Sequence, residues 1–471
     1  MDQYHSQDWV QSLHQFEHII ATSSESLQVE SLIKLSHLSN RIPVTILVST
    51  VPILVDLLDT STTNSVLKAS VYCLKCISCQ GDGKLAVTIG QSRAIHRILC
   101  LLPQSELALQ RVLLKCIRNI VAFDGPNRVN LVRIGGLKVV IDMLNSDTCP
   151  DDSLRRLLLD ILSALALLRE VRRSVFNLRA VGLLVEACKV GKMVSRARAG
   201  QAIGLLGLVK RARRELVNSG AIEALVDLLR NGDVSTRLVA GNALGVISSH
   251  VDYIRPVAEH GVIPLYAELL REQEPLGKEI AEDVFCILAV TDDNAVAIVE
   301  HLVTIMRGND NESVGAAADV VWDLSSYKHV LPVFHSFGVI SLLVELLRRS
   351  DDSNVKEKVC GAIGQLSYND AERVVIADLG GISVLINMLE DESEEVKDNA
   401  AQALVCLYED PLLCDRMSGA LSHPVFLRVR ERMVQTRAAE LRLAESVRQM
   451  TVDELTWNPA LGIKHPMKRF R

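Results

Sequence analysis

A short apolar phrase recurs through this 471-residue chain at intervals of about 41 residues, and this period constrains the fold more than any other feature. The phrase opens with a small residue and continues with Leu-Val-x-Leu-Leu or a close variant. Its clearest copies begin at Gly220, Gly261, Gly338 and Gly380. Weaker copies begin at Ser49, Arg93, Gly135, Arg179 and Ala297. A fixed period in this range indicates a solenoid, in which each unit packs only on its neighbours and the working part is a long surface.

Each copy is followed by a longer stretch whose apolar residues recur at the spacing of one helix face. Such stretches occupy 194–209, 234–250, 276–290, 312–326, 354–368 and 395–408. A shorter segment with turn-forming residues then leads to the next copy, as in 124–132. Alternating stretches of useful length for a strand are not found. The repeat unit is therefore predicted to be a short helix, a helix and a long helix.

The repeat pattern divides the chain into three parts. Residues 1–48 are expected to hold capping helices and a partial first repeat, because a terminal repeat must present a polar outer face. Residues 49–422 are expected to form the repeat array. Residues 423–471 are expected to form an amphipathic helix at 425–450 and a basic tail. This helix either caps the last repeat or detaches to bind the acidic end of the array or another protein.

Composition narrows the class of protein. The net charge of -6 is too mild to indicate nucleic-acid binding, and the polar first twenty residues do not resemble a signal peptide. The most apolar stretch, 42–55, is too short for a membrane-spanning helix, which needs roughly 20 apolar residues. We therefore expect a monomeric cytoplasmic or nuclear protein with no transmembrane segment.

Neither a metal site nor a catalytic site is predicted. Among the eleven cysteines, Cys73, Cys76 and Cys79 have C-x-x-C-x-x-C spacing. A structural zinc site needs four ligands, and no second C-x-x-C or H-x-x-x-H lies nearby. The histidines are dispersed, and the chain contains no H-E-x-x-H, G-x-S-x-G or Gly-rich phosphate loop. We expect packed thiols, no cofactor, no small-molecule substrate and no enzymatic activity.

The repeat unit resembles the armadillo repeat. The resemblance rests on the G-x-I-x-x-L-V-x-L-L phrase, the A-x-x-A-L-x-x-L helix, and Asn127-Arg128 or Glu372-Arg373 in the connecting turn. It covers roughly residues 25–430, and it implies an all-α, right-handed α-solenoid of about nine to ten repeats with helical caps. Within the family, the residues of these repeats are most similar to those of plant armadillo proteins of the U-box-associated type. The Cys-Pro-Ile-type opening of a U-box is not found, so ligase activity is not carried over.

In the armadillo family, the third helix of each repeat lines a groove, and an Asn on it commonly binds the backbone of an extended peptide. The matching positions are polar in three repeats, at Asn119, Asp323 and Gln365. Four central positions are apolar and lie 41 residues apart, at Ala164, Leu205, Val246 and Ile287. The position one turn earlier is Trp in importin-α. Here it holds other residues, among them Lys115, Gln201 and Asn242.

The chain lacks the recurring Trp and Asn pairs of importin-α, so binding of nuclear-import cargo is a poor interpretation. The apolar positions themselves have two interpretations. Either the helices are rotated slightly and these side chains pack inward, or they receive the apolar face of a partner helix.

Charge is distributed unevenly along the array. Residues 169–214 carry 12 Lys or Arg against two Glu, whereas residues 345–415 carry 16 Asp or Glu against six Lys or Arg. Two arginine pairs lie 41 residues apart and are expected to stack on one edge, Arg172-Arg173 and Arg213-Arg214. They indicate either a basic strip that docks an acidic partner or an ordinary solvated surface, since one Arg per connecting turn is common in the family.

The sequence thus predicts a non-catalytic scaffold or adaptor that binds a partner protein segment along the groove and the basic edge. The candidate contact residues are Lys115, Asn119, Arg172, Arg173, Leu205, Arg213, Arg214, Asn242, Val246, Asp323 and Gln365. The alternative, on family analogy alone, is a substrate-recruiting component of ubiquitin ligation. A nuclear-import adaptor is the third reading.

Overall fold

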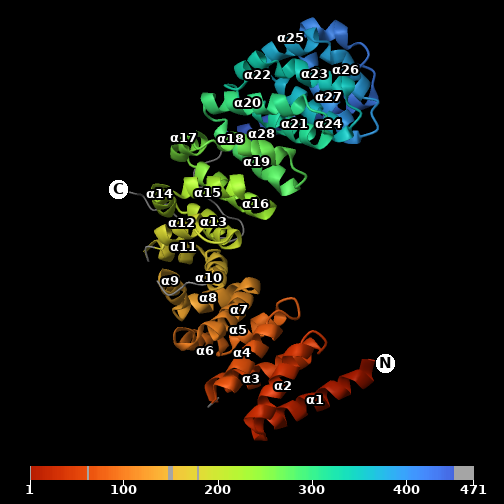
Figure 1. The fold of residues 1–471 in the computed structure, drawn as a ribbon. Coiled ribbons are helices and arrows are strands. Elements are labelled where there is room, and N and C mark those ends of the chain that lie inside the picture. Colours follow the sequence, from red (N-terminus) through yellow and green to blue (C-terminus); the bar gives the residue numbers. More distant parts are fainter. Residues whose placement is uncertain (1, 61–62, 147–151, 178–179, 450–471) are drawn as a thin grey trace. The chain divides into compact units, whose positions relative to one another are not determined.

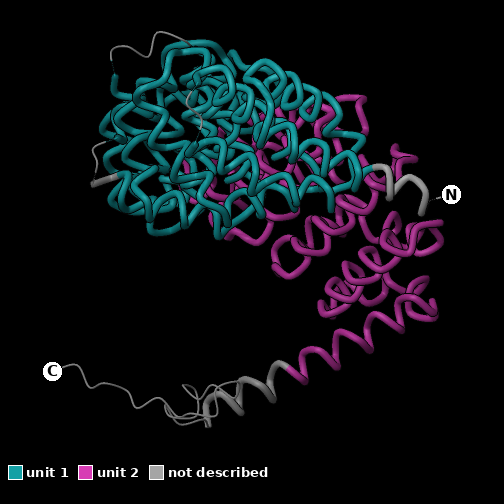
Figure 2. Tube along the Cα trace, turned by 90° about the horizontal axis from the view of Figure 1, so that it is seen from below, with its two compact units in different colours: residues 1–265 teal, residues 266–471 magenta. Residues whose placement is uncertain are grey.

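A computed structural model describes the chain except for residues 1, 61–62, 147–151, 178–179 and 450–471 (Figure 1). All regular structure in the described residues is helical, and no strand occurs among them. The helices form an all-α solenoid. The chain divides into two compact units, residues 1–265 and 266–471 (Figure 2).

Unit 1 begins with two helices and continues as repeats of three. The leading helices are α1 (Asp2–Thr22) and α2 (Glu25–Leu38). The first helices of the repeats are α5 (Lys84–Gln91), α8 (Gly125–Arg133), α11 (Arg169–Asn177), α14 (Lys210–Asn218) and α17 (Val251–Glu259). The second helices are α3 (Val44–Thr60), α6 (Ala94–Leu101) with the 3-10 turn η1 (Leu102–Gln104), α9 (Gly136–Asn145), α12 (Val181–Lys189) and α15 (Ala221–Asn231). The third helices are α4 (Asn64–Ile77), α7 (Leu107–Phe123), α10 (Asp152–Leu165), α13 (Met193–Gly207) and α16 (Val234–Ser248).

Unit 2 follows the same plan, with α18 (Val262–Arg271) spanning the boundary. Its third helices are α19 (Pro275–Leu288), α21 (Asn311–Leu324), α24 (Ser353–Leu366) and α27 (Glu394–Tyr408). Its other helices are α20 (Asp292–Met306), α22 (Leu331–Phe337), α23 (Val339–Arg349), α25 (Asp370–Asp378), α26 (Gly381–Met388), the 3-10 helix η2 (Pro411–Met417) and α28 (Pro424–Gln449).

Within each unit, third helices stack on third helices. In unit 1, α4, α7, α10, α13 and α16 contact one another in that order, and in unit 2 the order is α19, α21, α24 and α27. Each contributes a buried stripe of Leu, Ile, Val and Ala, which supplies the core. The six long stretches predicted from the apolar period are confirmed, because the third helices begin and end within two residues of them.

Glycine sets the corner between the first and second helix of most repeats. Gly135, Gly220, Gly261, Gly338 and Gly380 have φ between 66° and 89°, which side-chain-bearing residues rarely adopt. Each of these glycines directly precedes the second helix of its repeat, at the position where a copy of the apolar phrase begins in the sequence.

The copy at Ala297 departs from the pattern. A corner was expected there, but α20 runs from Asp292 to Met306 without a break and replaces both the first and the second helix. The segment 292–306 contains neither Gly nor Pro, so nothing interrupts the helix. This copy begins 36 residues after the one at Gly261, an interval shorter than the usual period of about 41 residues.

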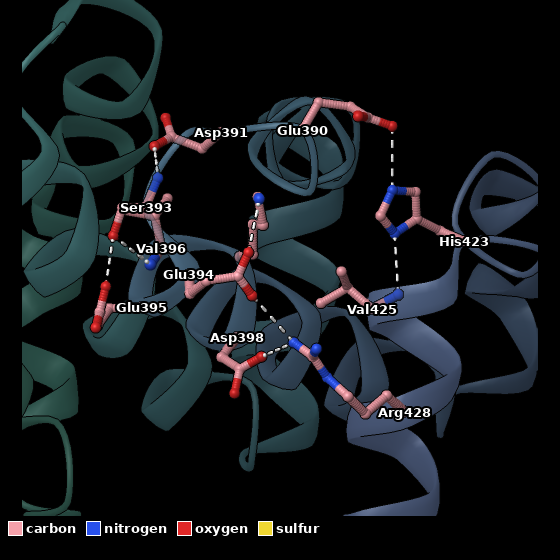
Figure 3. A network of polar contacts seen from close by, with 11 residues as sticks. Glu390, Asp391, Ser393, Glu394, Glu395, Val396, Asp398, His423, Val425 and Arg428 are labelled. Atoms are coloured by element: carbon pink, nitrogen blue, oxygen red, sulfur yellow. Dashed lines mark hydrogen bonds and ion pairs between the residues drawn. The ribbon is translucent and has the colours of Figure 1, made fainter.

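The start of the C-terminal helix packs on the last repeat. Phe426 and Val429 of α28 are fully buried, and α28 contacts α27. Asp398 Oδ1 of α27 accepts a hydrogen bond from Arg428 Nη2 at 2.7 Å (Figure 3). Its Oδ2 accepts one from Arg432 Nη1 at 3.0 Å. The start of α28 therefore lies against α27, and its buried side chains are those of Phe426 and Val429. The side chains that continue the predicted stripe beyond residue 439, and the basic tail, lie outside the described residues.

Among the described residues, no single helix is long and apolar enough to span a bilayer. The bent helix pair α22–α23 has the length and composition of a span only when its two helices are taken together.

Candidate protein-interaction surface

The third-helix face of unit 1 carries apolar side chains that are only partly covered. Ala164 on α10, Leu205 on α13 and Val246 on α16 are each half-buried, as is Ile287 in the corresponding place on α19. Each of these side chains is therefore partly packed against the core and partly accessible to solvent. Leu208, in the turn between α13 and α14, is 51% exposed.

Polar residues flank these positions one turn earlier. Gln201 and Asn242 are exposed on the same helices. Gln201 Oε1 accepts Arg198 Nη1 at 3.1 Å, so a partner's backbone would meet the Asn242 amide and the Nε2 side of Gln201. We define the third-helix face by these two amides together with Leu205, Leu208 and Val246. It combines apolar area with groups that both donate and accept hydrogen bonds.

Asn119, at the matching position on α7, is buried and not exposed to a partner. It is 5% exposed, and its Nδ2 donates to Ser78 Oγ at 3.0 Å and Cys79 Sγ at 2.9 Å, while Arg118 Nη2 donates to its Oδ1 at 3.1 Å. The amide therefore ties α7 to the end of α4. Lys115, one turn earlier on α7, is half-buried.

A charge ladder crosses three repeats beside these residues. Asp160 on α10 receives Arg198 Nε of α13 at 2.7 Å and faces Arg118 Nη1 of α7 at 3.8 Å. Burial raises the pKa of Asp160, and the arginines partly offset that effect. The ladder fixes neighbouring third helices against one another.

The equivalent face of unit 2 is acidic. Asp323 on α21 is exposed, and Gln365 on α24 is half-buried. Burial raises the pKa of Glu282 to about 7, with further contributions from the charges of Asp319 and Asp323. Lys358 Nζ lies 3.0 Å from Asp319 Oδ2.

The predicted arginine pairs split into two environments. Arg172 Nε donates to Ala166 O at 2.7 Å and its Nη2 to Leu167 O at 3.1 Å, and Arg213 Nε donates to Gly207 O at 2.7 Å. Both arginines are half-buried, whereas Arg173 and Arg214 are exposed. The first member of each pair therefore binds the last carbonyls of a third helix, where a cation also favours the helix dipole.

The same bond recurs in other repeats, and it was missed from the sequence. Arg128 Nε donates to Val121 O and Arg373 Nε to Ser367 O, each at 2.7 Å. Three of these arginines reach the carbonyl six residues earlier. An Arg that recurs near the period of the chain, in three repeats six residues after the carbonyl that its Nε binds, was the signal in the sequence for this helix-capping bond.

Within the part of the chain that the structure describes, no group of three or more His, Cys, Asp or Glu could hold a metal ion. Cys73 is fully buried, Cys76 is half-buried and Cys79 is exposed, so the three thiols face different surroundings. Burial raises the pKa of the Cys73 thiol well above its usual range.

Comparisons with known proteins agree with this architecture. The model of the Armadillo/beta-catenin-like repeat matches residues 210–249, 336–368 and 369–405. No curated protein sequence matches the chain.

Among solved structures, a crystal structure of an engineered protein has a TM-score of 0.67 at 22% identity, covering 84% of this chain and 98% of its own. A second engineered protein has a TM-score of 0.38 at 24% identity, covering 49% of this chain and 96% of its own. The first of these likenesses concerns the fold alone. The first matched segment lies in unit 1 and the other two lie in unit 2, and all three coincide with helices of the all-α solenoid.

Proposed function

We propose that the protein is a non-catalytic interaction scaffold whose third-helix face in unit 1 binds a segment of a partner protein. The observation that carries the proposal is the run of half-buried apolar side chains at Leu205 and Val246, flanked by the exposed amides of Gln201 and Asn242. A partner helix would cover the apolar atoms, and its polar groups would meet the amides. Full burial of an exposed Leu or Val contributes roughly 1.5–3 kcal/mol, and covering the remaining exposed part of these half-buried side chains contributes a fraction of that.

The partner is expected to be protein-sized. Armadillo repeats bind other proteins, and helix layers about 8–10 Å apart offer a surface that a small molecule would not fill. The face is also built on helices whose contacts fix their spacing, as the Arg118–Asp160–Arg198 ladder illustrates. A cytoplasmic or nuclear location, monomeric state and kinship with plant U-box-associated armadillo proteins remain parts of the proposal.

The experiment compares partners captured by proximity labelling with the wild type and with Leu208→Asp. Leu208 is 51% exposed, so the substitution is expected to leave the fold intact, which circular dichroism checks. Val251→Asp is the matched control, because Val251 is 71% exposed and lies on a first helix. We expect Leu208→Asp to lose partners that the wild type and Val251→Asp retain. Equal capture by all three proteins would contradict the assignment.

Recruitment of substrates for ubiquitin ligation is the alternative. It rests on family analogy, and its test is direct. Ubiquitin chains formed with the purified chain, E1, E2 and ATP would favour it over a passive scaffold. Captured partners without such chains favour the scaffold.

A further inference from the structure

A second surface of unit 1 lies along the first helices of its repeats. An open hollow of about 450 Å³ is lined by Gly125, Pro126, Val129, Asn130, Arg133 and Leu168. The first five belong to α8, and Leu168 stands in the turn between α10 and α11. Val129 is 53% exposed, so an apolar side chain that entered the hollow would contact it directly.

The rim of the hollow is basic. Arg133 is exposed, and its Nη2 donates to Asn130 Oδ1 at 3.0 Å, which holds the guanidinium beside the opening. Arg169 directly follows Leu168 and is also exposed, as is Arg173 one turn further along α11.

The basic character continues onto the next repeat. α14 packs against α11, and its exposed cations are Lys210, Arg211 and Arg214. The acidic groups on these elements are fewer. Asp124 accepts the backbone N–H of Asn127 at 2.9 Å and so caps α8, while Glu170 and Glu215 are exposed. We call the hollow and the exposed cations of α11 and α14 the first-helix edge.

We propose that the first-helix edge docks an acidic segment of a partner protein that carries one bulky apolar anchor residue. The anchor enters the hollow over Val129 and Leu168, and carboxylates beside it pair with Arg133, Arg169 and the cations that follow. The proposal extends the scaffold function above to a separate surface, and the two can fail independently.

Two physical arguments select this occupant. Arginine binds carboxylates through two parallel N–H···O bonds, so a row of exposed arginines favours an acidic ligand. An apolar hollow at the start of the row favours an amino-acid side chain, because an anchor in a desolvated pocket supplies most of an interface's energy. Single-stranded nucleic acid would need aromatic stacking platforms, and the residues that line the hollow offer none.

The first experiment is a selection from a displayed library of random 16-residue peptides. The full chain serves as bait, and binders of the double variant Arg133→Glu/Arg173→Glu are removed beforehand. We expect the enriched peptides to share a bulky apolar residue with at least two Asp or Glu within four positions. No enrichment, or a neutral or basic consensus, overturns the proposal.

The second experiment titrates one selected peptide, labelled with fluorescein, and follows anisotropy. We expect Val129→Asp and Arg133→Glu each to weaken binding at least tenfold, and binding to weaken as salt rises. The controls are Val251→Asp and Arg230→Glu, which change exposed residues of unit 1 outside the hollow and outside α11 and α14, and both are expected to bind like the wild type.

Asn242→Arg separates the two surfaces, because Asn242 is exposed within α16, a third helix that carries none of the first-helix-edge residues. If it abolishes peptide binding while Val129→Asp does not, the third-helix face is the site, so the first-helix edge is refuted and the scaffold function stands. A 20-nucleotide oligouridine that binds the wild type and loses binding in Val129→Asp, with the acidic peptide inactive, also overturns the proposal.

Discussion

Arg172 and Arg173 are neighbours of the same type whose roles the structure separates. Arg172 donates through Nε and Nη2 to the carbonyls of Ala166 and Leu167 at the end of α10, whereas Arg173 is exposed on α11. We expect Arg172→Ala to destabilise the repeat and Arg173→Ala to leave its stability unchanged.

The magnitude follows from the two bonds. Each intramolecular hydrogen bond contributes about 0.5–1.5 kcal/mol net, and a cation at a helix C-terminus adds about 0.3–1 kcal/mol. Solvent screens part of this because Arg172 is only half-buried, so a loss of about 1–2 kcal/mol is expected for Arg172→Ala. Surface substitutions without such contacts usually stay within about 0.5 kcal/mol, which sets the expectation for Arg173→Ala.

Hydrogen exchange is the appropriate measurement, because a repeat protein opens locally and a single global unfolding energy understates a local change. Amides in the last turn of α10 and in α11 should exchange roughly tenfold faster in Arg172→Ala, since about 1.4 kcal/mol corresponds to a tenfold change in opening. Amides in α15 should be unaffected. Equal exchange in the two variants would refute the assignment of Arg172 to helix capping.

Three further outcomes are expected. A Cβ at Gly361 would lie 2.5 Å from ring atoms of Trp322, so Gly361→Ala should cost about 1–3 kcal/mol in urea unfolding, and an unchanged midpoint would argue against this close packing. Burial raises the pKa of Glu282 to about 7, so the protonated side chain stabilises the fold at low pH and this contribution is lost as pH rises through 7. At pH 8 the free energy of unfolding of Glu282→Gln should exceed that of the wild type by about 1 kcal/mol, after allowance for solvent screening, and thermal melting checks this. Below pH 4.5 the two proteins should be equally stable. Asp398→Asn removes the ion-pair acceptor of two arginines, so amides at 425–436 should exchange several-fold faster, whereas unchanged protection would show that apolar packing alone holds α28.

The repeat could be predicted from the sequence because two local signals agree. Apolar period and glycine position both depend on neighbouring residues only, and both recur at Gly220, Gly261, Gly338 and Gly380. The corner expected near Ala297 failed because the apolar phrase persists there while the residue that permits a left-handed backbone does not. The apolar phrase and the left-handed glycine are therefore separable signals.

The candidate site was less accessible to sequence reasoning. Exposure on a helix depends on how neighbouring helices are rotated, which the apolar pattern leaves undetermined. The groove position of Asn119 is occupied by an amide, yet that amide is consumed by contacts to Ser78 and Cys79 in the preceding repeat. Arg172 and Arg173 are adjacent residues of one type, and in the structure the direction of each side chain separates a helix cap from an exposed cation.

The unequal corners also bear on whether this chain can be shortened by design. Excising 221–261 would join Gly220 to Val262, the residue that follows the equivalent left-handed glycine, so one module would be removed cleanly. A deletion that begins at one of these glycines and ends inside α20 has no matching junction at which to reconnect. Modular editing of the array should therefore tolerate the first kind of cut and fail at the second.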